Sequence, residues 1–476
     1  MSKKFAYIFP VCLFAGVALQ ALGFYLFALL IPLLWVSSLP LEKMVLGRLK
    51  KISLALMGLF LIFPICSLWN SLFLPPQMIS SFLPKDLSLP GKDLLRSSLS
   101  SAVFLSGGTL LCFCLFKKNG QEKKIGKHWA DLKAFHSHFL SGFFFATVCL
   151  LVFVLLQQFL GFDYRVSGMI LPDHERLESG FYRSPGLYGH PLSLAAVALG
   201  LFTFFGYLAT EKWGSWLHHR FFSRGEPQAE ILNLLGEDSW KVRIYLSLIS
   251  LFHLYFVVAS GGRTATFIAI SFLLVFCTRI FYQASGWKFF SWKSFIFLNV
   301  FPPILLALLM PLLPMLSRFR GLLADPGSTF LQHFDRLKFW IVHWYMFQDK
   351  PWLGQGLAQL HSGYREAYYE ALGFGWLRDK FNAHNLYLEI LAEVGIVGAL
   401  SFFLFSFLAM RQLKGLSRAR GSYILYQAFL WAILANLFHS FTQNVFFDSN
   451  VTLIYLSLFF LVIWFSLTNI FRQEFQ

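Results

Sequence analysis

The sequence predicts an all-α polytopic membrane protein with about 12 transmembrane helices and a large helical loop between helices 9 and 10. Its composition is the first reason, because 57% of the residues are hydrophobic and only 13% are charged, unlike a soluble domain. The second reason is that the apolar residues form repeated runs long enough to cross a bilayer. The third is that basic residues concentrate in alternate segments between these runs, as they do in cytoplasmic loops.

The apolar runs predict the order of the helices. The first two runs are almost continuous, so we interpret them as two membrane helices and not as a removed signal peptide. The predicted spans are residues 5–21, 23–40, 53–73, 98–116, 137–160, 187–209, 244–260, 264–283, 294–314, 385–409, 423–441 and 451–470.

The distribution of lysine and arginine predicts the orientation of the chain. By the positive-inside rule, the basic loops and both termini face the cytoplasm. The net charge of +16 therefore reports membrane orientation and gives no reason to expect nucleic-acid binding. The basic loops run from Lys43 to Lys51, Lys117 to Lys133, Lys212 to Arg243, Lys288 to Lys293 and Arg411 to Arg420, with Lys3, Lys4 and Arg472 near the ends.

One outward segment is long enough to fold by itself, so we divide the chain into residues 1–314, a cap at 315–384, and residues 385–476. An amphipathic pattern in the cap predicts a helix that lies on the membrane surface. The residues of this pattern are Phe330, Phe334, Leu337, Ile341 and Trp344. Four aromatic residues could stack on sugars or anchor the cap to the membrane, namely Trp344, Tyr364, Tyr368 and Trp376.

The cysteines and carboxylates give little indication of a metal. All six cysteines fall in apolar segments, where we expect inert core thiols: Cys12, Cys66, Cys112, Cys114, Cys149 and Cys277. The stretch Asp173-His174-Glu175 could ligate a cation, but a solvated loop carries such residues anyway and no partner cluster is evident. We therefore predict no metal and no cofactor.

Two arginines lie on the outward side, where the positive-inside rule gives no reason for them. Arg183 precedes a Gly/Pro-rich stretch that ends in Gly189-His190-Pro191, and Arg263 follows Ser260-Gly261-Gly262 in a turn so short that it must head the eighth helix. A guanidinium can clamp a phosphate with two donors, and glycine amides at a helix start can approach an anion. The alternatives are a loop-forming role for Arg183 and an interfacial, snorkelling role for Arg263.

His384 lies where the long loop re-enters the membrane as the tenth helix. An imidazole there can act as a general base on an acceptor hydroxyl, or it can simply hydrogen-bond at a helix entrance capped by Asn382. Glu389 and Glu393 share one face of this helix, so we expect them to face the protein interior and to pair with arginine. For His190 we expect a loop-packing role.

These motifs together resemble the O-antigen ligase and O-antigen polymerase superfamily of bacterial envelope enzymes, most closely the ligases. The resemblance rests on Arg183 to Pro191, on the SGGRTA stretch at Ser260 to Ala265, and on AHNLYLEILAEVGIVG from Ala383 to Gly398. Arg336, Trp340 and the PWLGQG stretch at 351–356 look like the large periplasmic loop of the family. The resemblance covers about residues 160 to 445, and Gly262 departs from the serine that usually precedes the arginine.

What the resemblance implies is an inner-membrane glycosyltransferase with a periplasmic active site and no metal. It would transfer a glycan from undecaprenyl diphosphate to lipid A-core with inversion, within lipopolysaccharide assembly of the cell envelope. By motif, Arg183 and Arg263 correspond to diphosphate-binding residues and His384 to the catalytic one. His190, Asn385, Glu389 and Arg336 lie in the same motifs and are candidates for supporting roles.

Other functions stay open at this point. The nearest alternatives are an O-antigen polymerase and a protein O-oligosaccharyltransferase that use the same lipid-linked glycan. A lipid-linked glycan transporter or flippase is an alternative of another class, although the sequence has no evident inverted repeat. A scaffold without chemistry would need neither the arginines nor the histidine on the outward side. The sequence does not identify the sugar, the acceptor or the oligomeric state.

Overall fold

The computed structural model describes the second half of the chain most fully. The described residues are 125–164, 168–177, 180–188, 190–222, 240–285, 326–355, 364–377, 383–417 and 420–443, with isolated positions between 47 and 55 and between 451 and 466. The predicted spans at 5–21, 23–40, 98–116 and 294–314 lie outside this part, as do Cys12, Cys66, Cys112 and Cys114.

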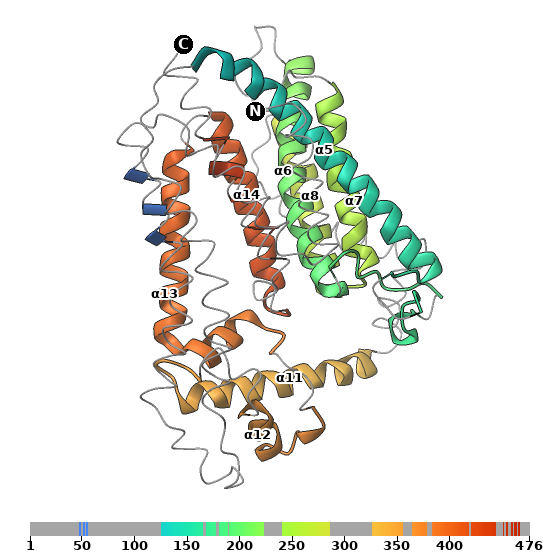
Figure 1. Ribbon diagram of the computed structural model, residues 1–476, viewed down its shortest axis with the longest axis vertical. Helices are drawn as coiled ribbons and strands as arrows, with labels where there is room; N and C mark the ends of the chain where they lie inside the picture. The colour runs from blue at the N-terminus through green and yellow to red at the C-terminus, as the bar shows by residue number, and fades with distance from the viewer. Residues whose placement is uncertain are drawn as a thin grey trace.

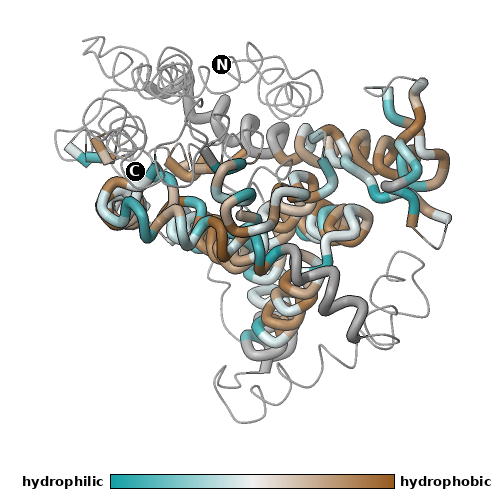
Figure 2. Tube along the Cα trace, turned by 90° about the horizontal axis from the view of Figure 1, so that it is seen from below, coloured by the Kyte–Doolittle hydropathy of each residue, from teal (hydrophilic) through white to brown (hydrophobic). Residues whose placement is uncertain are grey.

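In the described part of the chain the fold is all-helical, with two isolated β-bridges and no strand. The long helices are α5 (Ile125–Leu160), α6 (Pro191–Phe222), α7 (Trp240–Ala259), α8 (Arg263–Ser285), α11 (Pro326–Asp349), α13 (Leu386–Leu416) and α14 (Arg420–His439), and α12 (Tyr364–Ala371) is short. Five of them, α5, α6, α7, α8 and α13, are long and apolar enough to cross a membrane. Hydrophobic residues run along these helices in Figure 2. The predicted helices at these five positions are confirmed.

Helix α6 is the centre of the bundle and packs against α7, α8 and α14 (Figure 1). In its apolar window 94% of the residues are buried, compared with 39–44% in the other four spans. Small residues allow this close packing, because they let neighbouring backbones approach. A Cβ at Gly200 would collide with Tyr455, and one at Gly206 would lie 2.7 Å from the ring of Phe276.

Three details of the sequence interpretation are wrong. The basic segments at 117–133 and 212–243 are not wholly loops, since α5 begins at Ile125 and α6 continues to Phe222. The extension of α6 is stabilised by Arg243 of α7, whose guanidinium lies 5.6 Å from the Trp213 ring and 5.1 Å from the Trp216 ring. Cys149 and Cys277 are exposed on the surfaces of α5 and α8, not buried in a core.

Helix α11 runs across the end of the bundle where α6 and α8 begin, at a steep angle to them (Figure 1). One side of α11 packs against α12 through Phe339, Val342 and Met346. The other side exposes Leu337, Ile341, Trp344 and Tyr345. The predicted amphipathic helix is therefore present, and the part of its apolar stripe that is described, at 337, 341 and 344, faces away from the protein.

Tyr368 of α12 is buried and not available to stack on a sugar. Its hydroxyl donates to Asp349 Oδ2 over 2.5 Å and accepts from Gln355 Nε2 over 3.0 Å. Trp376 is exposed, but Lys338 Nζ lies 4.8 Å from its ring centroid. Because Tyr368 is buried, it neither stacks on a sugar nor anchors the cap to the membrane.

Helix α13 is broken at Gly395, where a continuous helix was expected from 385 to 409. Gly395 has φ 65° and ψ −168°, and the loop at 351–355 inserts into the break. Gln355 N–H donates to the carbonyl of Ala392 over 2.8 Å, and Ile396 N–H donates to the carbonyl of Pro351 over 2.8 Å. The loop thus replaces hydrogen bonds that the helix lacks.

Two glycines permit this contact. A Cβ at Gly354 would collide with the backbone of Glu393, and a Cβ at Gly395 would collide with the backbone of Trp352. Both glycines also have a positive φ. Backbone packs on backbone at this crossing. The cap loop is therefore fixed to the part of α13 that follows His384.

Candidate functional site

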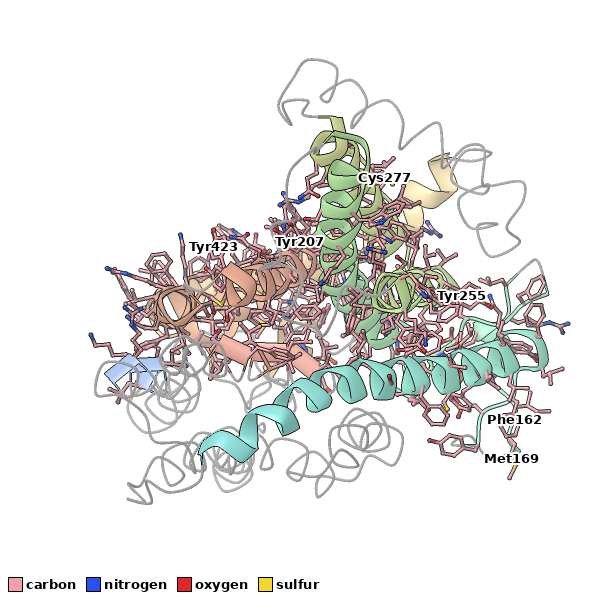
Figure 3. The ribbon with its side chains drawn as sticks, turned by 90° about the horizontal axis from the view of Figure 1, so that it is seen from above. Phe162, Met169, Tyr207, Tyr255, Cys277 and Tyr423 are labelled. Atoms are coloured by element: carbon pink, nitrogen blue, oxygen red, sulfur yellow. The ribbon has the colours of Figure 1, made fainter. Side chains whose placement is uncertain are left out.

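The candidate site lies where six helix ends meet: the ends of α5, α7 and α14 and the starts of α6, α8 and α13. Three backbone hydrogen bonds join these ends. Tyr182 N–H donates to the carbonyl of Gln158, Ser184 N–H to the carbonyl of Ala259, and Leu386 N–H to the carbonyl of Ser440. Figure 3 shows Phe162 and Met169 beside the C-terminal end of α5, in the segment that follows this helix.

The loop that carries Arg183 is organised by Gln157 of α5, a buried residue whose amide is used on both sides. Its Nε2 donates to Asp163 Oδ2 over 2.9 Å and to the carbonyl of Gly186 over 3.0 Å. Its Oε1 accepts from the N–H of Gly186 over 2.8 Å and from the hydroxyl of Ser184. All four hydrogen-bonding positions of the amide are filled, so the loop is fixed by a side chain with no unused donor or acceptor.

Arg183 is held against the turn that precedes α8. Its Nε donates to the carbonyl of Ser260 over 3.2 Å, and its Nη1 pairs with Glu175 Oε2 over 3.1 Å. Burial lowers the pKa of Arg183, Glu175 raises it, and the charge of Arg263 lowers it. The guanidinium stays charged, and its Nη2 makes no hydrogen bond within the described residues.

Arg263 is the first residue of α8, as the short turn predicted. A Cβ at Gly261 would lie 3.1 Å from Arg183 Nε, so glycine lets the two arginine segments meet. The glycine amides are not free for an anion, contrary to our expectation. Gly261 N–H donates to the carbonyl of Val258 over 2.9 Å, and Gly262 N–H donates to Ser260 Oγ over 3.1 Å.

The anion-binding capacity of this turn therefore resides in the guanidinium groups. Nη1 of Arg263 is buried and has no hydrogen-bond partner among the described residues. A buried N–H without a partner is rare in proteins and is commonly explained by a ligand.

His384 lies just before α13 with φ 47°, an uncommon backbone conformation for a residue other than glycine. The N-cap of α13 is Asn385, whose Oδ1 accepts from the N–H groups of Tyr387 and Leu388 over 3.0 and 3.2 Å. We had expected Asn382 to cap this helix, and that was wrong, because the chain turns sharply at His384 and the helix starts only at Leu386. Asn385 thus has a structural role.

The imidazole of His384 is oriented by Gln443, whose Oε1 lies 2.9 Å from Nδ1. An amide oxygen can only accept, so Nδ1 carries the proton and Nε2 keeps its lone pair. The ring also packs against Phe339 of α11, with 5.7 Å between centroids. This tautomer is the one that a base acting through Nε2 requires.

Charges surround His384 from several elements. Burial lowers its pKa, the hydrogen bond to Gln443 raises it, Arg336 lowers it, Glu389 raises it, and His190 lowers it. With a lowered pKa, the imidazole is neutral at physiological pH, which is the form that can accept a proton.

The predicted site residues come together although they are far apart in the chain. The charge of Arg263 acts on Arg183 and on Arg336, and the charge of Arg336 acts on His384. Burial also lowers the pKa of Arg336, ahead of the effect of Arg263. His190 joins this cluster from the start of α6, where its Nδ1 accepts from Leu192 N–H over 3.1 Å, so it has a capping role as well.

Glu389 and Glu393 are buried in the interior between α13 and the cap, as predicted. Glu389 Oε2 accepts from Ala383 N–H over 2.6 Å and lies 3.5 Å from His343 Nε2. Both carboxylates lie near Arg365 of α12, where they raise the pKa of a guanidinium that burial lowers. The arginine that lies near these carboxylates therefore comes from the cap.

The stretch at 173–175 forms a short 3-10 helix, and Glu175 pairs with Arg183. Within the described residues no group of three His, Cys, Asp or Glu side chains is arranged to hold a metal ion. The carboxylate of Glu175 thus serves to hold an arginine.

Several residues of the site were missed by sequence reasoning: Gln157, His343, Arg365, His439 and Gln443. His439 ends α14, is buried, and lies close enough to Arg336 to feel its charge. Polar residues within otherwise apolar helices were the available signal for Gln157 and His439. His343 carries the same signal within an apolar stretch of α11, whereas Arg365 and Gln443 lie in polar segments where nothing marks them.

The fold and the site together define a membrane-embedded helical protein with a cationic site and a neutral histidine at one end of its bundle. Residues 248–403 match the family model described as O-antigen ligase, which confirms the resemblance to the O-antigen ligase superfamily. The matched part contains Arg263, Arg336 and His384, and Arg183 lies before it. The match supports a ligase-type or polymerase-type membrane enzyme in general terms. No curated protein matches the chain.

Proposed function

We propose that the protein is a glycosyltransferase that transfers O-antigen glycan from undecaprenyl diphosphate to lipid A-core at the periplasmic face of the bacterial inner membrane. The observation that carries this proposal is the convergence of Arg183, Arg263 and His384 from three distant parts of the chain. Arginines suit the binding of a diphosphate, and a neutral histidine suits the removal of one proton.

The proposed reaction is a single displacement at the anomeric carbon. The acceptor hydroxyl oxygen attacks this carbon, and its proton moves to Nε2 of His384. The bond from the carbon to the phosphate oxygen breaks, and its electron pair stays on the leaving undecaprenyl diphosphate. Arg183 and Arg263 stabilise the negative charge that develops there. The new bond forms on the face opposite the leaving group, so the configuration inverts, and the reaction requires no metal or cofactor.

In this proposal both termini face the cytoplasm, and the end of the bundle that carries the site faces the periplasm. The exposed stripe of α11 at Leu337, Ile341 and Trp344 then lies in the membrane interface. Both substrates are lipids, so a cap on the membrane surface brings them to the site without removing them from the bilayer.

The test is transfer by the purified protein, given undecaprenyl diphosphate-linked glycan and lipid A-core in the presence of a chelator. We expect glycan on lipid A-core, resolved by size, and no product with His384→Asn. Elongation of the lipid-linked glycan alone would make the protein a polymerase, and product on a protein hydroxyl would make it an O-oligosaccharyltransferase. Movement of the lipid-linked glycan across a bilayer without transfer would indicate a transporter.

A further inference from the structure

The backbone of His384 needs support, because a non-glycine residue at positive φ costs about 1 kcal/mol or more and persists only when its surroundings hold it. On one side, the cap of α13 by Asn385 fixes the chain that follows. On the other side, the N–H of Ala383 is bound by Glu389 Oε2 over 2.6 Å. Glu389 thus reaches back over one helical turn to hold the residue before His384.

Glu389 is buried and needs partners of opposite charge or strong hydrogen-bond donors, because an unpaired carboxylate is costly in an apolar interior. The cation near it comes from the cap. His343 of α11 lies beside Glu389, with Nε2 at 3.5 Å from Glu389 Oε2, but it is not a donor to the carboxylate. Its Nδ1 lies 2.8 Å from the carbonyl of Phe339 and therefore carries the proton, and burial lowers its pKa, so the neutral ring has no hydrogen on Nε2. Arg365 of α12 is buried beside Glu389 and Glu393.

The cap is also fixed in place relative to α13. The loop at 351–355 is inserted into the break at Gly395, only six residues after Glu389. The same α11 that carries His343 also presents Phe339 to the ring of His384 and carries Arg336. Ring and charge contacts from the cap therefore meet at the turn that bears His384, and backbone contacts around Gly395 fix the cap to the same helix.

We propose that Arg365 of the cap acts through Glu389 as a positioning residue that holds His384 in its strained orientation. This inference rests on the proposed role of His384 as the base. The cap is then part of the catalytic apparatus, and it is more than a surface for the acceptor.

The charge of Glu389 gives the proposal a signature that a purely structural role would lack. The groups that face His384 are Arg336 from α11, Glu389 from α13, His190 from the start of α6, and the uncharged Gln443 after α14. Glu389 raises the pKa of His384, against the larger lowering by burial. If the carboxylate is removed, the pKa of His384 falls, and the neutral imidazole persists to lower pH.

The experiment uses Glu389→Gln, whose amide oxygen can still accept from Ala383 N–H, and Glu389→Ala, which loses both the charge and the hydrogen bond. Two readouts are taken for the full-length protein in detergent. The first is the pH profile of transfer with kcat and KM. The second is the pH dependence of carbethoxylation of His384, followed by peptide mass spectrometry, which reports the pKa of His384 without any need for activity.

We expect Glu389→Gln to move the acid limb of transfer and the midpoint of carbethoxylation to lower pH. Glu389→Ala and Arg365→Gln should lower kcat by about tenfold to a hundredfold and leave KM for the glycan donor within about twofold, since they misplace the base but not the arginines. Arg365→Lys should recover part of the loss. The matched control is Glu370→Gln on the exposed side of α12, which should leave both readouts unchanged.

An unchanged carbethoxylation midpoint in Glu389→Gln, or a wild-type kcat in Glu389→Ala, would overturn the positioning role. A wild-type protein that modifies normally at His384 but transfers no glycan would instead overturn the proposed function. The two failures are therefore distinguishable.

Discussion

The site has two parts that are held in place differently: the arginine side, around Arg183 and Arg263, and the histidine side, around His384. On the arginine side, Gln157 fixes the loop with three hydrogen bonds to uncharged groups and one to the carboxylate of Asp163. The carbonyl of Ser260 and the carboxylate of Glu175 hold Arg183. On the histidine side, the turn depends on Glu389, which is buried beside His343 and Arg365. One side belongs to the helix bundle and the other joins α13 to the cap.

This difference indicates a division of roles. None of the contacts named for the arginine side comes from a histidine, the side chain that ordinarily changes its charge between pH 5 and 8, so this side should bind its anion equally well across that range. The buried charges on the histidine side do act on the pKa of the imidazole, so this side should govern how the rate depends on pH. Substitutions on the arginine side should therefore change anion binding, and substitutions on the histidine side should change how the rate depends on pH.

The largest effect is expected from His384→Asn. Asparagine tolerates positive φ, so the backbone of the turn is kept and only the base is lost. We expect kcat to fall by about 10²–10⁴-fold, with little change in thermal stability. Steady-state transfer and a melting curve from one preparation would check this. A kcat within about threefold of wild type would remove His384 from the chemistry.

Arg263→Lys should have the next largest effect. An ammonium keeps the charge but cannot reproduce two parallel hydrogen bonds to a phosphate, so kcat/KM should fall by about tenfold to a hundredfold. Arg176→Lys is the matched control, since Arg176 is an exposed arginine near the same end of the bundle. Equal activity of Arg263→Lys and wild type would reduce the role of Arg263 to charge steering.

Gln157→Leu should have a smaller effect on transfer and a clearer one on stability. The buried hydroxyl of Ser184 and the N–H of Gly186 then lose their hydrogen bonds to Gln157 Oε1. Each loss costs about 1–3 kcal/mol, so the melting temperature should drop by several degrees. The pH profile should keep its shape, because no charge is removed near His384. Gln158→Leu is the control, since among the described residues the Gln158 side chain has one hydrogen bond, from the hydroxyl of Tyr255 of α7. Figure 3 shows the position of Tyr255.

The smallest effect is expected from Arg336→Gln. Arg336 lowers the pKa of His384, so its removal raises this pKa. The acid limb of the pH profile should then move to higher pH, opposite in sign to the shift expected for Glu389→Gln. A shift in the same direction in both variants would show that the charges around His384 are not those described.

The sequence predicted the parts of the site that are marked by local pattern. Basic residues on the outward side singled out Arg183 and Arg263, and the shortness of the turn placed Arg263 at the head of α8. The break at Gly395 was missed, because glycine in an apolar run does not reveal that a distant loop will pair with the helix there. The proximity of Arg365 to Glu389 was missed for a similar reason, since it depends on how the cap packs on α13.

The central claim is that the arginines bind the glycan donor and the histidine reacts. Equilibrium binding of undecaprenyl diphosphate-linked glycan to wild type, His384→Asn and Arg263→Lys tests it most directly. We predict an unchanged Kd for His384→Asn and a Kd raised about tenfold or more for Arg263→Lys. Equal weakening in both variants, or a wild-type Kd for Arg263→Lys, would contradict the account.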